Sequence, residues 1–190
     1  YEARQPPLIT WLYWLVTRGA GISPPAVFAV KYVLMFVGLS FYYLAARNIL
    51  IRPGVSAATM AAWALTFQVG WGMHEDLLGG VGLMAVLAIS FHAITRILTW
   101  RRWLDWFYLG VAMGLGLLTH HLFLVFPIAM LVAIMVSPFF RDAISLGRIL
   151  LMLLAAAAIY APYAYWVATH ATTLSDAARE YVASWEIDGG

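Results

Sequence analysis

The chain has 190 residues, of which 64% are hydrophobic and only 11% are charged, with no cysteine and a formal net charge of +2. The absence of cysteine excludes disulfides, thiolate metal sites and thiol nucleophiles, and the small net charge gives no reason to expect a nucleic-acid partner. Long apolar runs separated by short polar segments fit membrane helices, because a spanning helix needs roughly 20 apolar residues and backbone in lipid must be hydrogen-bonded within its own segment. The sequence therefore predicts an all-α, polytopic transmembrane helical bundle.

The first predicted element, at residues 7–18, is too short to span a membrane. It is amphipathic and aromatic, and Pro7 suits the first turn of a helix. Its aromatic side chains, Trp11, Tyr13 and Trp14, favour the level of the lipid head groups. We expect an interfacial helix that lies along the outer surface of the membrane.

About six spans are expected after this helix, at 26–46, 55–72, 77–98, 104–118, 122–138 and 149–168. The apolar run from 104 to 138 is too long for one span, so two short helices are predicted to meet at Thr119–His121. Non-helical backbone at membrane depth survives only where protein or a water-filled cavity covers it. The chain starts with Tyr1 rather than methionine, and we expect residues 1–190 to be part of a larger transmembrane domain.

The arginines indicate an orientation, because Lys and Arg mark the cytoplasmic side of short loops. With the predicted spans, three loops on one side carry Arg47, Arg52, Arg96, Arg101, Arg102, Arg141 and Arg148, and most acids fall on the other side. We expect the arginine loops in the cytoplasm and both ends of the chain outside; the location in a bacterial inner membrane is implied only by the family resemblance described below.

The candidate site lies on the side opposite the arginine loops. Ionisable groups within or at the edge of a membrane helix are expensive and are functional candidates by default. At least one of the adjacent residues His120 and His121 should face a cavity, where a protonated imidazole holds a phosphate. Lys31, near the outer end of the first span, either reaches the interface or lines the same cavity.

Glu75 and Asp76, at the start of the third span, complete this set of polar groups together with His74. Imidazole and carboxylate are suitable ligands for a divalent metal. The spacing contains no chelate pattern such as histidines at i and i+4, so no metal site is assigned and any cofactor stays unknown. For His74 and His170, exposure to water at helix ends is the simpler interpretation.

Five segments in sequence order resemble a known family. They are Gln5-Pro6-Pro7-Leu8-Ile9-Thr10-Trp11-Leu12, Phe28-Ala29-Val30-Lys31-Tyr32-Val33-Leu34, Asp76 after an aromatic-rich loop, Gly114-Leu115-Gly116-Leu117-Leu118-Thr119-His120-His121, and Ala161-Pro162-Tyr163-Ala164-Tyr165-Trp166. This series is similar to that of the GT-C membrane glycosyltransferases, in particular the bacterial branch related to protein mannosyltransferases and aminoarabinose transferases.

The resemblance implies transfer of a sugar from a polyprenyl-phosphate donor to a lipid, glycan or protein acceptor on the outer face of the membrane, with inversion. In such chemistry a carboxylate takes the acceptor's proton and a cation stabilises the departing phosphate. The residues expected to bind substrate are Asp76, Glu75, His120, His121, Lys31 and Gln5, of which Glu75 and His121 depart from the family's pattern. The family has a lysine where this chain has His120, so phosphate binding is expected to be weaker or favoured by acid. The family's catalytic Asp is expected upstream of residue 1, so the chain alone should be inactive.

Other interpretations stay open. A non-catalytic relative would bind a lipid-linked sugar or assist a partner enzyme. A small transporter or channel would show paired broken helices or inverted repeats, and a structural subunit would need no polar cluster at Thr119–His121. The sequence does not specify the sugar, the acceptor, the carrier length or the oligomeric state.

Overall fold

The structure is a computed structural model that describes residues 7–21, 23–66, 68–72, 79–136 and 144–170. Within these ranges all regular structure is helical, which confirms the all-α prediction. The elements are α1 (Leu8–Ala20), α2 (Pro24–Ile49), α3 (Pro53–Ala64), η1 (Gln68–Gly72), α5 (Gly79–Trp100), α6 (Trp103–Thr119), η2 (His121–Leu124), α7 (Val125–Val136) and α9 (Leu146–Thr169).

The long helices fit a membrane bundle. Helices α2, α5 and α9 have the length and hydropathy needed to cross a bilayer, and α6 contributes a shorter apolar helix. Proline at the first turn starts α2 and α3, where its missing N–H costs nothing. The expectation of a helical membrane bundle is confirmed, whereas the number of six spans stays a prediction.

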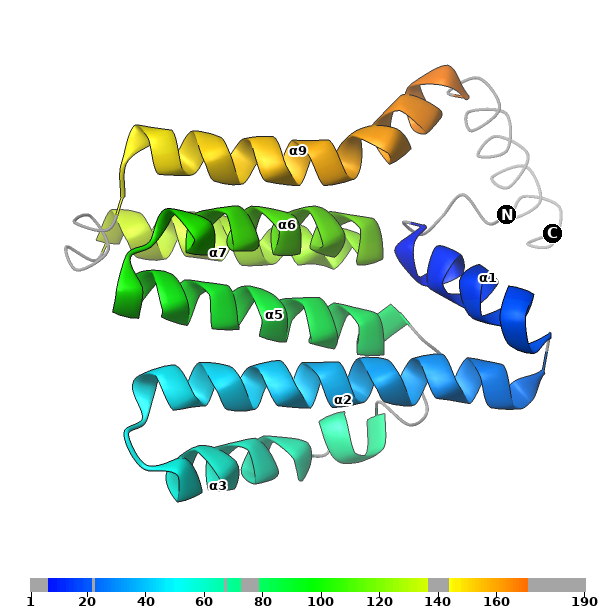
Figure 1. The fold of residues 1–190 in the computed structure, drawn as a ribbon, viewed down its shortest axis with the longest axis horizontal. Helices are drawn as coiled ribbons and strands as arrows, with labels where there is room; N and C mark the ends of the chain where they lie inside the picture. The colour runs from blue at the N-terminus through cyan, green and yellow to red at the C-terminus, as the bar shows by residue number, and fades with distance from the viewer. Residues whose placement is uncertain (1–6, 22, 67, 73–78, 137–143, 171–190) are drawn as a thin grey trace, which may run out of the picture.

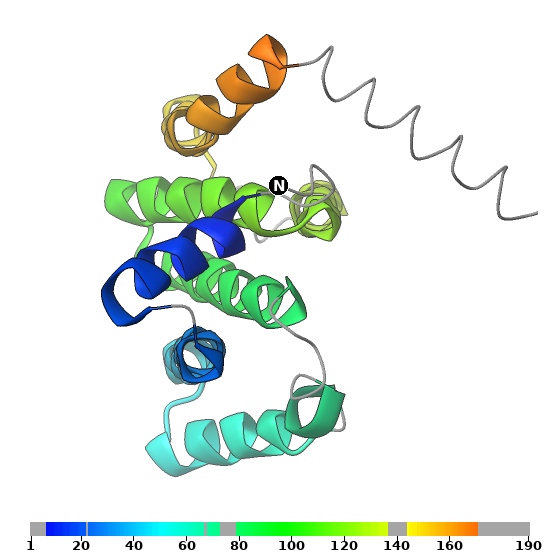
Figure 2. The same ribbon diagram turned by 90° about the vertical axis from the view of Figure 1, so that its right-hand side faces the viewer.

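The helices form a row in which sequence neighbours run in opposite directions (Figure 1). From one side to the other the order is α3, α2, α5, α6 and α9, and α7 lies beside α6 (Figure 2). The most extensive pairings join α2 to α5 and α6 to α9. The short helix α1 lies across one end of the row, where it packs on α2 and α6.

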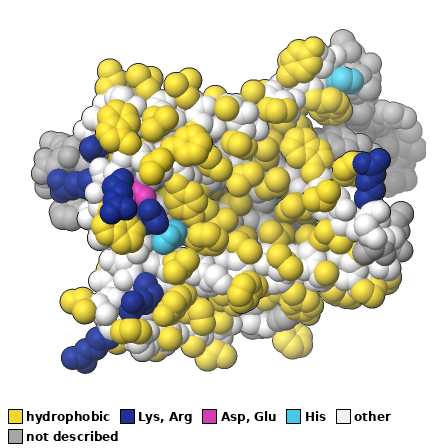
Figure 3. Space-filling view, viewed as in Figure 1, with side chains coloured by type: hydrophobic (Ala, Val, Ile, Leu, Met, Phe, Trp, Pro, Cys, Tyr) yellow, Lys and Arg dark blue, Asp and Glu magenta, His cyan; other side chains and the backbone are white. Residues whose placement is uncertain are grey.

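The opposite end of the row gathers basic side chains (Figure 3). The connections from α2 to α3, from α5 to α6 and into α9 all lie there, and these connections and the adjoining helix ends carry Arg47, Arg52, Arg101, Arg102 and Arg148. We call this end, together with Arg96 one turn before the end of α5, the arginine end. The end that α1 covers is called the histidine end, because His120 lies there.

Helices α6 and α9 approach closely through small residues. A Cβ atom on Gly110 would collide with the carbonyl oxygen of Met152, and one on Gly114 would lie 2.6 Å from Ile159 Cβ. Glycines four residues apart are typical of membrane helices that pack backbone to backbone. In α9 the matching surface is Ala155 and Ala156, both buried. This contact fixes α6, and so fixes the position at which α6 ends.

Candidate functional site

The histidine end is closed by α1. Pro7 is fully buried, and a Cβ atom on Gly82 would lie 2.5 Å from Ile9 Cδ1 and 2.9 Å from Thr119 Cγ2. Helices α1, α5 and α6 therefore meet with no room for a side chain at position 82. The Thr119 hydroxyl donates to the Leu115 carbonyl at 2.7 Å, so the buried end of α6 is satisfied by its own backbone.

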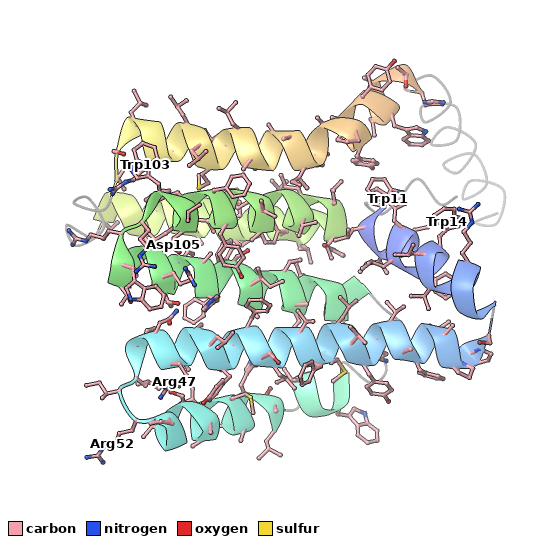
Figure 4. The ribbon with its side chains drawn as sticks, in the orientation of Figure 1. Trp11, Trp14, Arg47, Arg52, Trp103 and Asp105 are labelled. Atoms are coloured by element: carbon pink, nitrogen blue, oxygen red, sulfur yellow. The ribbon has the colours of Figure 1, made fainter. Side chains whose placement is uncertain are left out.

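The face of α1 that points away from the bundle is apolar and aromatic, and its position at a membrane interface stays a prediction. Trp11, Trp14 and Leu15 are exposed, and the Arg18 guanidinium lies 4.7 Å from the centre of a Trp14 ring. Figure 4 shows both tryptophans on the helix that covers this end of the bundle. Exposed tryptophan beside arginine suits the head-group level of a membrane.

His120 lies where helix α6 stops. Its backbone is extended, with φ −159° and ψ 142°, and η2 begins at the next residue. The Leu122 N–H donates to His120 Nδ1 at 3.0 Å, so the imidazole caps η2. An accepting Nδ1 carries no proton, which places the proton of the neutral ring on Nε2. His120 Nε2 is thus a hydrogen-bond donor, fixed in direction by the cap.

The turn after His120 is held in place by a buried aromatic side chain. Phe123 is fully buried, and its ring occupies the space that a side chain at position 116 would need. Gly116 therefore lets η2 fold back against the end of α6. Phe123 also packs on Phe126 at 5.6 Å between ring centres. These apolar contacts hold the short irregular segment that carries His120.

Lys31 is buried in α2 and only 3% exposed. A lysine that reaches the interface keeps its ammonium in water, so this burial argues against the interface interpretation. Lys31 is seven residues after Pro24, which corresponds to about 10 Å along a helix axis. Lys31 and His120 therefore belong to the same end of the bundle, on α2 and at the end of α6.

The remaining predicted residues fall outside the described ranges. Gln5, His74, Glu75 and Asp76 lie in segments that the structure does not describe, and of His121 it describes only the backbone at the start of η2. Within the described ranges, no three His, Asp or Glu side chains come together as a metal site requires. The structure thus brings two of the predicted residues, His120 and Lys31, to one end.

Sequence analysis missed a polar cluster at the arginine end. Arg96 Nε donates to Asp105 Oδ1 at 2.6 Å, and Asp105 is 1% exposed. Asn48 Nδ2 donates to Thr95 Oγ1 at 2.8 Å and lies 3.2 Å from His92 Nδ1. The available signal was Asp105 itself, an acid one turn after two arginines, where a carboxylate suits the start of a helix.

A large apolar cavity lies between α2, α5 and the segment from α3 to η1. Its volume is about 620 Å³, and its walls include Tyr42, Trp63, Val69, Phe91 and Phe126. Tyr42 stacks on Trp63 with ring centres 4.3 Å apart, which shapes one wall. A cavity with walls of this kind suits a hydrocarbon chain rather than a polar ligand.

The fold and the order of the motifs define a class, which the comparison with known families identifies. Residues 4–166 match the family described as dolichyl-phosphate-mannose-protein mannosyltransferase. The match covers most of the chain, and the chain belongs to this family of membrane glycosyltransferases. The resemblance to GT-C membrane glycosyltransferases is confirmed.

The chain is also similar to two curated proteins of Rhizobium johnstonii. The chain is 29% identical over 163 residues to the lipopolysaccharide core galacturonosyltransferase RgtA of Rhizobium johnstonii, and the same values hold for RgtB of that organism. Each alignment covers 86% of this chain and 33% of the relative, so the chain spans about a third of the length of these curated relatives. No solved structure gives a significant match.

Proposed function

We propose that the protein containing this chain transfers a sugar from a polyprenyl-phosphate donor to an acceptor on the outer face of a bacterial inner membrane, with inversion. Residues 1–190 would form part of its transmembrane domain, with the arginine end in the cytoplasm. Family membership supports the reaction class. The observation that carries the site is the donor nitrogen of His120, directed by its cap at the point where α6 ends beneath α1.

His120 is proposed to bind the donor phosphate. Its Nε2–H can donate to a phosphate oxygen while Nδ1 keeps its bond to Leu122. A second proton would add charge that strengthens phosphate binding, but it would occupy Nδ1 and remove the cap. The buried Lys31 ammonium is proposed as a second positive group on the path of the donor, because intramembrane cations mark substrate pathways.

The acids are proposed to act on the sugar side of the donor. Asp76 and Gln5 are proposed to bind substrate as the family resemblance implies, Glu75 and His121 are proposed to bind it beside them, and the principal base is expected upstream of residue 1. A carboxylate general base must lie within hydrogen-bond reach of the acceptor hydroxyl. The chain alone is therefore proposed to bind donor without turning it over.

The apolar cavity near the histidine end is proposed to hold part of the polyprenyl tail. Its volume of about 620 Å³ and its aromatic and aliphatic walls match a branched hydrocarbon. The relatives are named as acting on lipopolysaccharide core. A core oligosaccharide is accordingly the first acceptor to test.

The test is transfer by the full-length protein with changes at position 120. His120→Ala removes both the cap and the donor, and transfer should be abolished. His120→Lys supplies the cation usual for the family and should retain transfer. Full transfer by His120→Ala at every pH would show that the phosphate site is elsewhere.

A non-catalytic relative is the second candidate, and one observation favours it. The imidazole that replaces the family's lysine is engaged in capping η2. Such a protein would bind a lipid-linked sugar or assist a partner enzyme. Full-length wild-type protein would then bind donor without releasing product, and His120→Lys would not create transfer.

A further inference from the structure

A polar cavity at the arginine end is separate from the proposed donor site. Its volume is about 350 Å³, and it is lined by Phe41, His92, Arg96, Leu104, Asp105 and Tyr108. His92 and Arg96 lie one turn apart on α5, and Asp105 and Tyr108 lie one turn apart on α6, so each pair shares one helix face. The two helices thus present polar groups to one space.

Three buried polar atoms on α6 lack partners among the described residues, and two of them belong to side chains that line this cavity. Asp105 is 1% exposed; its Oδ1 accepts from Arg96, but its Oδ2 accepts no hydrogen bond there. The Tyr108 hydroxyl, also buried, has no partner either. Buried polar groups are nearly always hydrogen-bonded. An acceptor and a donor that line the same cavity indicate a ligand with both a donor and an acceptor.

Arg96 adds a cation with a fixed direction. Its Nε is held by Asp105 at 2.6 Å, and its guanidinium lies 4.9 Å from the centre of a Trp100 ring. The two terminal amino groups have no hydrogen-bond partner in the described part of the chain, and the side chain is 33% exposed. A guanidinium held through Nε offers its terminal N–H groups to the oxygens of a phosphate.

Exposed tryptophans lie beside the cavity. Trp100 and Trp103 are exposed at this end, as is Leu104 in the cavity wall, and exposed tryptophans mark the membrane interface. Asp105 is the only acid in the described ranges, and Figure 3 shows a single acidic patch next to several basic ones at this end. The local charge is therefore strongly positive, which favours an anionic ligand.

We propose that this cavity binds the head group of an anionic phospholipid of the phosphatidylglycerol type. The phosphate oxygens accept from the Arg96 terminal amino groups and from the Tyr108 hydroxyl. A glycerol hydroxyl of the head group donates to Asp105 Oδ2. Phosphatidic acid lacks that hydroxyl, and phosphatidylethanolamine leaves the positive charge of this end uncompensated. The proposal is independent of the sugar-transfer reaction, because the site is at the other end of the bundle.

The experiment measures lipid binding to the full-length protein purified in detergent. Native mass spectrometry and thermal unfolding are followed as phosphatidylglycerol, phosphatidylethanolamine, phosphatidylcholine or inorganic phosphate is added. Tyr108→Phe is the main variant, because it removes an unpartnered hydroxyl and should leave the fold intact. Arg96→Lys keeps the positive charge but loses the two terminal amino groups of the guanidinium. Arg52→Gln, an exposed position at the same end, is the control for general electrostatic attraction.

Phosphatidylglycerol should bind the wild type best, with roughly tenfold weaker binding to Tyr108→Phe and Arg96→Lys and less than a twofold change for Arg52→Gln. Three results would overturn the proposal. They are equal binding of phosphatidylcholine, phosphatidylethanolamine or inorganic phosphate, unchanged phosphatidylglycerol binding by Tyr108→Phe, and a loss in Arg52→Gln as large as that in Tyr108→Phe.

Discussion

The two ends of the bundle are held together in different ways. At the arginine end, side chains on α2, α5 and α6 hydrogen-bond one another through Asn48, Thr95, Arg96 and Asp105. At the histidine end, His120 bonds to a backbone group two residues away, and α1 is seated by apolar contacts of Ile9. Polar bonds between membrane helices contribute about 1 kcal/mol each, so the arginine end is fixed by directional bonds between helices.

The bundle therefore has one end that is held by hydrogen bonds between helices and another end that carries the proposed donor site. The arginine end sets the register of α5 against α6 over the two-residue connection Arg101–Arg102. Together with the close contact between α6 and α9, that register determines where the 17-residue helix α6 ends and hence where His120 is presented. Substitutions that break the bonds between helices at the arginine end should mainly change stability, whereas substitutions at the histidine end should mainly change binding of the sugar donor.

The largest effect is expected from Arg96→Ala. The change leaves the Asp105 carboxylate buried without its partner, and breaking such a pair costs about 3–5 kcal/mol. Because Arg96 is one-third exposed, we expect the lower part of that range. This loss of stability is measured as the change in the free energy of unfolding of the full-length protein in mixed micelles. The double variant Arg96→Ala/Asp105→Leu should regain most of the loss, and a single-variant loss below 1 kcal/mol would contradict the role of the pair.

Gly110→Val tests the contact that fixes α6 against α9. The new side chain would meet the Met152 carbonyl, and overpacking of this kind costs about 1–3 kcal/mol. The same unfolding measurement applies. Ala157→Val, on an exposed face of α9, is the matched control and should be nearly neutral. Equal losses in both variants would show that α6 and α9 do not depend on this approach.

At the histidine end, His120→Ala should cost only about 1 kcal/mol of stability, because it removes one cap. His120→Asn supplies another capping side chain and should restore that stability without restoring the imidazole donor. Comparing unfolding with transfer for both variants sharpens the contrast between the ends. A stability loss above 3 kcal/mol for His120→Ala would mean that this end also depends on a structural polar group.

The smallest change in the free energy of unfolding is expected at Arg101, and here the change is a gain in stability rather than a loss. Its φ is +53°, in the left-handed region that costs residues other than glycine about 1 kcal/mol or more. Arg101→Gly should therefore raise the unfolding free energy by up to about 1 kcal/mol, reduced by glycine's greater freedom in the unfolded chain. Arg102→Gly at the neighbouring position, which is extended, should not stabilise the protein.

The sequence alone predicted the all-α class, because the length and composition of its apolar runs indicate whether a segment lies in lipid or in water. The same reasoning predicted that the loop arginines lie on one side of the membrane, and the structure places those that it describes at one end of the bundle. The Arg96–Asp105 pair was missed because a pair nine residues apart becomes visible only when the turn between α5 and α6 is known. Likewise, the burial of Lys31 depends on which face of α2 packs on α5, and a nearly uniform apolar helix does not reveal that face. The cap formed by His120 depends on one side-chain rotation, which residue types alone do not specify.

The central claim is that the histidine end binds the phosphate of the lipid-linked donor through His120. The most direct test is the dissociation constant of polyprenyl phosphate for full-length wild type and for His120→Asn, measured beside their thermal unfolding. We predict binding about tenfold weaker in the variant, with unchanged stability, since the cap is kept and the donor nitrogen is lost. Equal dissociation constants in two equally stable proteins would contradict the claim.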